Sequence, residues 1–401
     1  MTSRTIVELH ILQTVPPSNL NRDDTGTPKS AVYGGVRRAR VSSQAWKRAT
    51  RRAFAQLLDR SELGVRTRQL AKLLGRRIRD REPSISETES WALAAETITA
   101  ATGAKMEPPK RNAKQDADAR AQGEGPEPAP EAKYLIFLSA RQLDALADLA
   151  VQGRDDIKAF FKKKENKSAA KQAANTRHSV DIALFGRMVA DGSDINVDAA
   201  AQVAHAISVH RADIESDYYT AVDDKEDGKG AGMIGSVEFH SATLYRYAAL
   251  DVDLLAKNLG QGLREEESAA TPVRRAVEAF VRGFTESLPT GKVNTFAHHT
   301  LPDAVVVKVR STRPVNFVGA FERPCQADQE TGGYVRDACE RLAKQIPAIE
   351  TAFGIGDDTL TWVMRAGEDT EALAALGTEL PLGELVTAVG AEVERRQNGT
   401  A

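Results

Sequence analysis

The sequence has little cysteine and no long apolar run, and these two absences exclude several classes of protein. Only two cysteines, Cys325 and Cys339, occur among 401 residues, which is too few for a disulfide framework or a cysteine-rich zinc site. No stretch approaches the roughly 20 apolar residues that a membrane helix needs. The N-terminus, MTSRTIVELH, lacks the apolar core of a signal peptide. The sequence therefore predicts a cytoplasmic protein.

Signatures of catalysis are also scarce. The seven histidines are scattered along the chain, and there is no HExxH, Walker A or GxSxG motif. The pairs Asp23–Asp24 and Asp223–Asp224 could hold a divalent ion, but paired acids in loops are usually solvated turn residues. We expect no catalytic residue, no metal site and no cofactor. The alternative is a metal-dependent endoribonuclease that uses Asp23 or Asp24.

Positive charge is present and is concentrated in one region. The formal net charge is -2, yet the stretch from Arg37 to Arg81 contains fifteen Lys and Arg residues against three acids. Acidic residues gather elsewhere, within 213–227 and in the tail after residue 350. A chain polarised in this way is typical of a protein with one face for a polyanion. The simpler alternative is a solvated helical surface.

The basic region contains a predicted amphipathic helix, SSQAWKRATRRAFAQLLDR, which begins after a serine N-cap. Apolar residues recur at helical spacing and form one stripe: Trp46, Ala49, Ala53, Phe54, Leu57 and Leu58. Gln44 falls on the opposite side, together with a basic ridge that we define as Lys47, Arg48, Arg51 and Arg52. We expect the apolar stripe to anchor the helix and the basic ridge to face the polyanion.

The residues before this helix add further phosphate donors. Gly34 and Gly35 let the backbone approach a ligand closely, and the guanidinium forks that follow suit phosphate: Arg37, Arg38 and Arg40. Ser42 and Gln44 can donate to phosphate oxygens or to a 2′-hydroxyl. Contacts of this kind position a nucleic acid without reading its sequence. We therefore predict nucleic-acid binding without base readout.

The remaining patterns predict an α+β fold. A half-buried strand is expected at 5–15, with Val7, Leu9 and Ile11 on its inner face. The other predicted elements are helices at 61–102, 141–153, 199–210, 271–289 and 334–348, strands at 179–189, 241–250 and 303–310, a short buried strand or helix start at 134–139, a disordered insertion at 103–133, and a hairpin with an acidic tip within 211–240. This order suits a β-α-β-β-α-β ferredoxin-like core with a long insertion and a projecting hairpin.

Six motifs occur in one order over roughly residues 4–345: NLNRDD, AVYGGVRRARVSSQAWKRATRR, VDIALFGRM, VAHAISVH, YTAVDD and SVEFHSATLYRYA. Together they resemble the CasC family of the RAMP superfamily, the repeated backbone subunit of the type I-E CRISPR Cascade complex. The resemblance implies an RRM-like (ferredoxin-like) palm, a large helical fingers insertion and a β-hairpin thumb. The implied segments are palm at 1–60, 179–210 and 241–350, fingers at 61–178, thumb at 211–240, and an acidic helical tail at 351–401.

The resemblance also implies a function. Copies would stack head to tail along one crRNA in the cytoplasm, hold its backbone, and displace nucleotides at regular intervals with the thumb. The guide would then pair with target DNA in antiviral defence, and the other Cascade subunits (large, small, 5′-handle and crRNA-processing) would be partners. Such a subunit does not cut nucleic acid. A generic basic RNA chaperone without ordered stacking is a further alternative.

Site residues follow from the matched motifs. The residues implied to hold the guide backbone are Arg22, Ser42, Gln44, Lys47 and Arg51. Met188 and Ile234 match apolar positions that wedge beside the displaced nucleotide, and Tyr218 and Tyr219 match aromatic positions at the base of the thumb. The predicted RNA-binding set is completed by Gly35, Arg37, Arg38, Arg48 and Arg187. From the residues alone, core packing is the better prediction for Met188 and Ile234, and only the resemblance reverses it.

Overall fold

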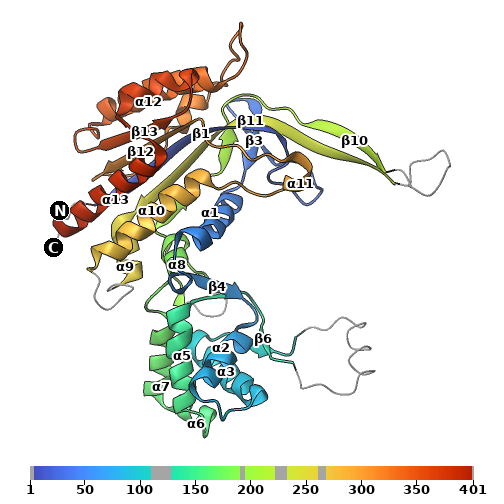
Figure 1. The fold of residues 1–401 in the computed structure, drawn as a ribbon, viewed down its shortest axis with the longest axis vertical. Coiled ribbons are helices and arrows are strands. Elements are labelled where there is room, and N and C mark those ends of the chain that lie inside the picture. The colour runs from blue at the N-terminus through green and yellow to red at the C-terminus, as the bar shows by residue number, and fades with distance from the viewer. Residues whose placement is uncertain (1–3, 110–127, 190–194, 222–232, 261–267, 400–401) are drawn as a thin grey trace. The chain divides into compact units, whose positions relative to one another are not determined.

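The computed structural model describes residues 4–109, 128–189, 195–221, 233–260 and 268–399. The chain divides into two compact units, shown in Figure 1. The first unit comprises Met1–Leu57, Ala201–Asp253 and Val273–Ala401, and the second comprises Leu58–Ala200 and Leu254–Pro272. Among the described residues, no helix has both the length and the apolar character needed to cross a membrane.

A ten-stranded sheet forms the first unit, in the order β14-β13-β12-β1-β11-β9-β3-β2, with β8 and β10 also paired to β11. Its strands are β1 (Ile6–Ser18), β2 (Ser30–Tyr33), β3 (Val36–Val41), β8 (Ala201–Val203), β9 (Ala206–Ser208), β10 (Glu215–Ala221), β11 (Met233–Asp251), β12 (Ala304–Arg310), β13 (Leu360–Arg365) and β14 (Thr378–Glu379).

The centre of this sheet has the ferredoxin-like arrangement. Along the chain, β1 is followed by α1 (Ser43–Leu57), then β9 and β11, then α10 (Ala270–Glu286) and β12. In space these strands lie in the order β12-β1-β11-β9, the 4-1-3-2 order of a β-α-β-β-α-β unit. The predicted α+β fold class is therefore confirmed.

Helices cover both faces of the central strand. On one face Ile11 lies opposite Arg246 of β11, whose guanidinium stacks on Trp46 of α1. On the other face His10 lies 5.0 Å, between ring centroids, from Phe317 of η3 (Phe317–Phe321). The prediction of a half-buried strand is wrong, because β1 is buried along most of its length on both sides.

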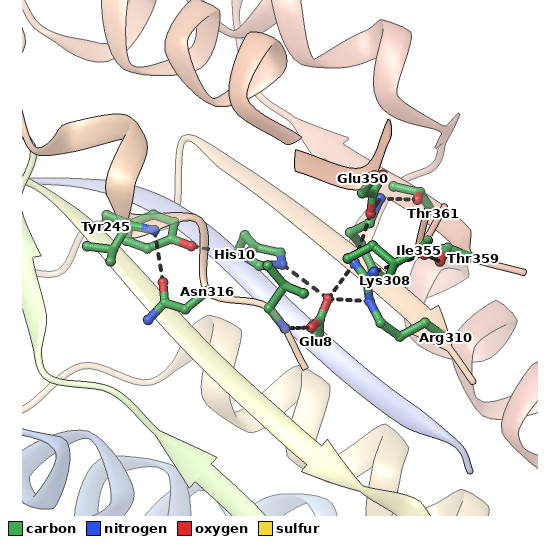
Figure 2. A network of polar contacts seen from close by, with 12 residues as sticks. Glu8, His10, Tyr245, Lys308, Arg310, Asn316, Glu350, Ile355, Thr359 and Thr361 are labelled. Carbon is green, nitrogen blue, oxygen red and sulfur yellow. Dashed lines mark hydrogen bonds and ion pairs between the residues drawn. The ribbon is translucent and has the colours of Figure 1, made fainter. Parts of the chain in front are cut away.

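Two polar residues of β1 consequently lie inside the protein. Glu8 is fully buried, and its Oε2 accepts from Arg310 Nε at 2.9 Å. Arg310 Nη2 also donates to Glu350 Oε1 at 2.8 Å, and Lys308 Nζ lies 3.2 Å from that same oxygen. His10 Nδ1 shares a hydrogen bond of 2.9 Å with the Tyr245 hydroxyl, and burial lowers the pKa of His10. Figure 2 shows this network, which joins β1 and β12 to the helix that carries Glu350.

The C-terminal part of the first unit contains helices and strands. Its remaining helical elements are α11 (Val293–Phe296), α12 (Val335–Phe353), η4 (Glu368–Leu376) and α13 (Leu382–Gly399). The segment 351–401, implied to be a helical tail, also contributes β13 and β14 to the sheet, where Val306 pairs with Val363. The predicted helices at 271–289 and 334–348 and the predicted strand at 303–310 are confirmed.

The second unit is mainly helical and has its own apolar core. Its elements are η1 (Arg60–Glu62), β4 (Gly64–Thr67), α2 (Leu70–Arg81), α3 (Glu87–Thr102), β5 (Met106–Glu107), β6 (Glu131–Ala132), β7 (Ile136–Ser139), α5 (Ala140–Gln152), α6 (Ile157–Lys162), α7 (Lys164–Ala174), α8 (Val180–Phe185) and most of α9 (Val252–Leu259). Leu74, Ile98, Leu143 and Leu146 are fully buried there.

Two predictions from local patterns are wrong, and a third is wrong at its ends. The predicted strand at 179–189 contains α8, because its apolar run is buried all round and its period does not separate helix from strand. The predicted helix at 199–210 is instead β8 and β9, which pair with β11. Tertiary pairing there overrides the helix propensity of alanine. The ends of the predicted disordered insertion, 103–133, pair as β5 and β6, while residues 110–127 lie outside the described residues.

The β2–β3 hairpin turns through Gly34 and Gly35, which both have positive φ, 59° and 78°. Tyr33 pairs with Val36 across this two-residue turn, a geometry that glycine adopts without steric cost. A Cβ on Gly34 would lie 1.7 Å from the backbone oxygen of Glu322, whereas a Cβ on Gly35 would meet nothing within 4 Å. Only Gly34 is required by packing as well as by backbone conformation.

Alanine substitutions in this turn should therefore differ in effect. Gly35→Ala should cost about 1–2 kcal/mol of unfolding free energy, the usual cost of the left-handed conformation. Gly34→Ala should cost at least about twice as much, because the hairpin must also move away from Glu322. Denaturant unfolding of the two variants measures the difference. Equal midpoints would contradict the close approach of Gly34 to Glu322.

Candidate nucleic-acid interface

Helix α1 is anchored as its pattern predicts. Trp46, Thr50 and Phe54 are buried, and Phe54 Cε1 would lie 3.3 Å from a Cβ on Gly283 of α10. On the other side Gln44, Arg48 and Arg52 are exposed, while Lys47 and Arg51 are half-buried. Partial burial lowers the pKa of Lys47. The helix thus presents the basic ridge on its outer side.

Ser42 has a structural position at the start of α1. It is 5% exposed, and its Oγ accepts from the Ala45 backbone N–H at 3.3 Å, as an N-cap does. Its own N–H donates to Asn21 Oδ1 at 2.9 Å. The structure therefore places Ser42 under the interface, where it orients the helix and is largely covered from a ligand.

The NRDD loop lies at the N-terminal end of α1 and is held in a fixed turn. The Asp23 carboxylate accepts from the backbone N–H groups of Thr25 and Thr27 at 3.0 Å each, and from the Thr25 hydroxyl at 2.7 Å. The hydrogen bond from the Thr25 side chain is the main cause of the lowered pKa of Asp23. Arg22 and Asp24 are exposed, so both side chains are presented to solvent.

Two asparagines that the sequence did not single out join this loop to its surroundings. Asn19 is fully buried, and its Nδ2 donates to the Gly26 oxygen at 3.1 Å and to the Glu238 oxygen of β11 at 2.9 Å. Asn21 accepts from Ser42. The loop is thereby tied both to β11 and to α1. The signal was present in NLNRDD, because asparagine side chains commonly hold loops through backbone contacts.

The arginines of β3 alternate between solvent and interior. Arg37 is exposed, but Arg38 is fully buried and donates to the backbone oxygens of Phe321 at 2.8 Å and Ser208 at 3.1 Å. Arg40 is half-buried, and its Nη1 lies 3.0 Å from His205 Nδ1. The prediction that Arg38 contacts phosphate is wrong, because its guanidinium points into the core and is bound there.

The same correction applies to Arg187 in the second unit. This residue is 4% exposed and donates to the backbone oxygens of Ile195 at 2.7 Å and Ala174 at 2.9 Å. Burial lowers the pKa of Arg187 to about 10. Its neighbour Met188 is 88% exposed, while Val189 is buried. Arg187 therefore holds this segment in place, and the segment presents Met188 to solvent.

Strands β10 and β11 form the predicted hairpin that projects from the sheet in Figure 1, and its tip at 222–232 lies outside the described residues. Tyr218 pairs with Ser236, and Thr220 pairs with Ile234. Directly paired residues share a face, and alternate residues of a strand do too. Tyr218 and Ile234 therefore lie on one face, where they are 64% and 61% exposed.

Tyr219 lies on the opposite face of the hairpin. It pairs with Gly235 and is 40% exposed. A Cβ on Gly235 would lie 2.5 Å from the Tyr219 hydroxyl oxygen, so the tyrosine covers the glycine across the strand pair. The two adjacent tyrosines, which match aromatic positions of the family, thus lie on opposite faces because side chains alternate along a strand.

Potential metal ligands are not gathered at this surface. The described residues contain no group of three or more His, Cys, Asp or Glu side chains that could hold a metal ion. Cys325 and Cys339 are free and buried, and burial raises the pKa of each thiol to about 12. The candidate residues described above are basic, polar or exposed apolar side chains.

Comparison with known proteins places the chain in a family. It matches the family described as "CT1975-like protein" over residues 7–388. A chain of a solved "CRISPR RNA-guided surveillance complex, pre-nicking" is 33% identical, with a TM-score of 0.77 over 97% of this chain and 100% of that one. A chain of a "CRISPR RNA-guided surveillance complex" is 30% identical, with a TM-score of 0.68 over 96% and 99%.

No curated protein matches the sequence. The similarity to two surveillance complexes nevertheless covers nearly the whole of each chain, and it confirms the resemblance that the sequence motifs indicated. Because the family match also spans most of the sequence, the chain belongs to the CT1975-like protein family.

Proposed function

We propose that the chain is a non-catalytic, crRNA-binding backbone subunit of a type I-E Cascade complex in the cytoplasm. Copies stack head to tail along the guide, hold its phosphates and present its bases to target DNA. The large, small, 5′-handle and crRNA-processing subunits complete the particle. Similarity to chains of CRISPR RNA-guided surveillance complexes supports this role.

The observation that carries the proposal is the exposure of the two wedge residues. Met188 is 88% exposed and Ile234 is 61% exposed, which excludes the core packing that their residue types favour. Apolar side chains held out in solvent suit insertion beside a base, where they replace part of the stacking that a displaced nucleotide loses. Phosphate contacts must offset the remaining cost.

The basic ridge supports the proposal that the subunit binds the guide backbone without reading its sequence. Its exposed members, Arg48 and Arg52, and the half-buried Lys47 lie on a rigid helix rather than on a mobile loop. Backbone contacts of this kind position RNA and leave sequence recognition to base pairing, as in other RNA-guided systems.

The non-catalytic role is supported by the NRDD loop. The ribonuclease alternative requires Asp23 or Asp24 to act on RNA or on a metal ion. The Asp23 carboxylate already accepts three hydrogen bonds from its own loop. This arrangement gives Asp23 a structural task and favours Arg22 as the loop residue that faces the guide.

The complex purified from cells that carry the partner subunits and a CRISPR array should contain RNA of one uniform length. Limited nuclease digestion should show protection at regular intervals, because each copy covers an equal segment. Extraction and sizing of the bound nucleic acid is the measurement. Random fragments, or cleavage of added complementary RNA that Asp24→Ala abolishes, would contradict the proposal.

Substitution of Lys47 and Arg51 by Ala should weaken RNA binding and flatten its salt dependence. The log–log slope should fall by about 0.7 for each lost phosphate contact to a single strand. Titration of RNA at several salt concentrations measures the slope. Lys344→Ala, at an exposed position of α12, is the matched control and should leave the slope unchanged. An unchanged slope in the ridge variant would show that the ridge faces something other than RNA.

Alanine substitutions of Tyr218 and Tyr219 should differ in their effect on RNA affinity. Tyr218→Ala should weaken RNA binding by about 1–3 kcal/mol, the usual contribution of one aromatic ring stacked on a base, because Tyr218 shares the face of Ile234. Tyr219→Ala should chiefly loosen the hairpin by uncovering Gly235. Affinity measurements on this adjacent pair provide their own control. A larger loss of affinity for Tyr219→Ala would reverse the assignment of faces.

A further inference from the structure

Arg246 of β11 is a buried cation with unusual partners. Its side chain is fully buried, and Nη1 donates to Gln13 Oε1 at 2.6 Å and to the Thr285 backbone oxygen at 3.3 Å. Nη2 donates to the Phe284 backbone oxygen. Among the residues that the structure describes, no carboxylate pairs with this guanidinium. Neutral oxygens and ring faces therefore stabilise the charge.

The end of α10 supplies two of the three acceptor oxygens. Phe284 and Thr285 belong to the last turn of α10, whose final carbonyls have no partner within the helix and carry the negative end of its dipole. The guanidinium carbon also lies 3.8 Å from the centroid of the Trp46 ring and 4.7 Å from that of Phe284. These are cation–π distances. Burial lowers the pKa of Arg246 to about 9, so the side chain remains charged at neutral pH.

This contact is costly as well as favourable. Arg246 Nε and Trp46 Nε1 are buried and have no hydrogen-bond partner among the described residues. Buried N–H groups without acceptors are rare in native proteins, and an apolar side chain would avoid the cost. A group that is retained at such a cost is expected where position matters more than stability.

Arg246 joins the two parts of the proposed guide-binding surface within the first unit. Through Trp46 it contacts α1, and the next residue of that helix, Lys47, begins the basic ridge. In the other direction, β11 runs as one strand from Met233 to Asp251. Ile234 and Arg246 are therefore borne by the same strand. Through Gln13 the guanidinium also contacts β1.

We propose that Arg246 is a positioning residue for guide binding. It fixes α1 against the strand that extends into the thumb, so that the basic ridge and the face with Tyr218 and Ile234 meet one RNA as a single surface. The Nη atoms of Arg246 bond to Gln13 of β1 and to the end of α10, and the guanidinium stacks on Trp46, so this one side chain holds α1 against both elements. This inference rests on the proposed function and adds a residue that touches no RNA.

The test is a double-mutant cycle on the full chain, with a single-stranded RNA oligonucleotide as the probe. The variants are Arg246→Met, the ridge pair Lys47→Ala with Arg51→Ala, and their combination. We expect Arg246→Met to weaken RNA binding about tenfold, a typical coupling for residues in one network. We expect the combined variant to bind no more weakly than the ridge pair, because Arg246 acts through the ridge. If the fold loss of affinity in the combined variant equals the product of the two separate losses, the inference is overturned.

Tyr245→Phe is the matched control. Tyr245 neighbours Arg246 on β11 but points to the opposite face, where its hydroxyl meets His10, so the variant should leave RNA affinity unchanged. If Arg246→Met does not fold, Trp46→Phe replaces it in the cycle. Trp46→Phe keeps the buried ring and the cation, and it should give a smaller loss that again does not add to that of the ridge pair.

The outcomes separate this inference from the proposed function. If the ridge pair binds RNA as tightly as the wild type, the proposed guide surface fails and the inference fails with it. If the ridge pair loses affinity while Arg246→Met and Trp46→Phe, both folded, bind like the wild type, only the positioning role is overturned. If Arg246→Met weakens RNA binding alone but adds no further loss of affinity to the ridge pair, the positioning role is supported.

Discussion

The central constraint on this fold is that β1 is covered on both faces while it carries a carboxylate. Glu8 cannot reach water, so Arg310 must accompany it, and Glu350 and Lys308 complete the group of charges. Removal of one member of such a buried pair leaves an uncompensated charge, which typically costs about 3–5 kcal/mol. Because Glu350 belongs to α12, the network fixes α12 on one side of the sheet. The opposite side remains for α1 and α10.

Buried arginines recur in this protein, so counts of basic residues overstate the positive charge that reaches its surface. Arg38 and Arg187 donate to backbone oxygens in the interior, and Arg246 does so at the end of α10. Each lies beside a residue whose side chain points elsewhere, as with Met188 next to Arg187. Composition gives the number of guanidinium groups, but only the alternation of side chains along the chain decides which of them face solvent.

Sequence patterns predicted the elements whose periodicity is long and unambiguous. The amphipathic α1 and the β-branched strand β12 are examples. Short elements were predicted wrongly, because β8 and β9 are defined by pairing with β11 rather than by their alanine-rich sequence. In the site, the basic ridge could be predicted from helical spacing. The exposure of Met188 could not, since an apolar residue type alone favours burial.

The length of β11 has an evolutionary consequence. The strand runs for 19 residues, and its N-terminal part forms the hairpin while its C-terminal part lies in the core of the sheet. Because side chains alternate with a period of two, one inserted or deleted residue between Ile234 and Arg246 would turn the hairpin's apolar face to the other side, unless a bulge absorbed it. Natural variation and engineering of this arm should therefore change its length in steps of two residues. Only changes of an even number of residues make the β10–β11 hairpin longer or shorter while its apolar face keeps its orientation.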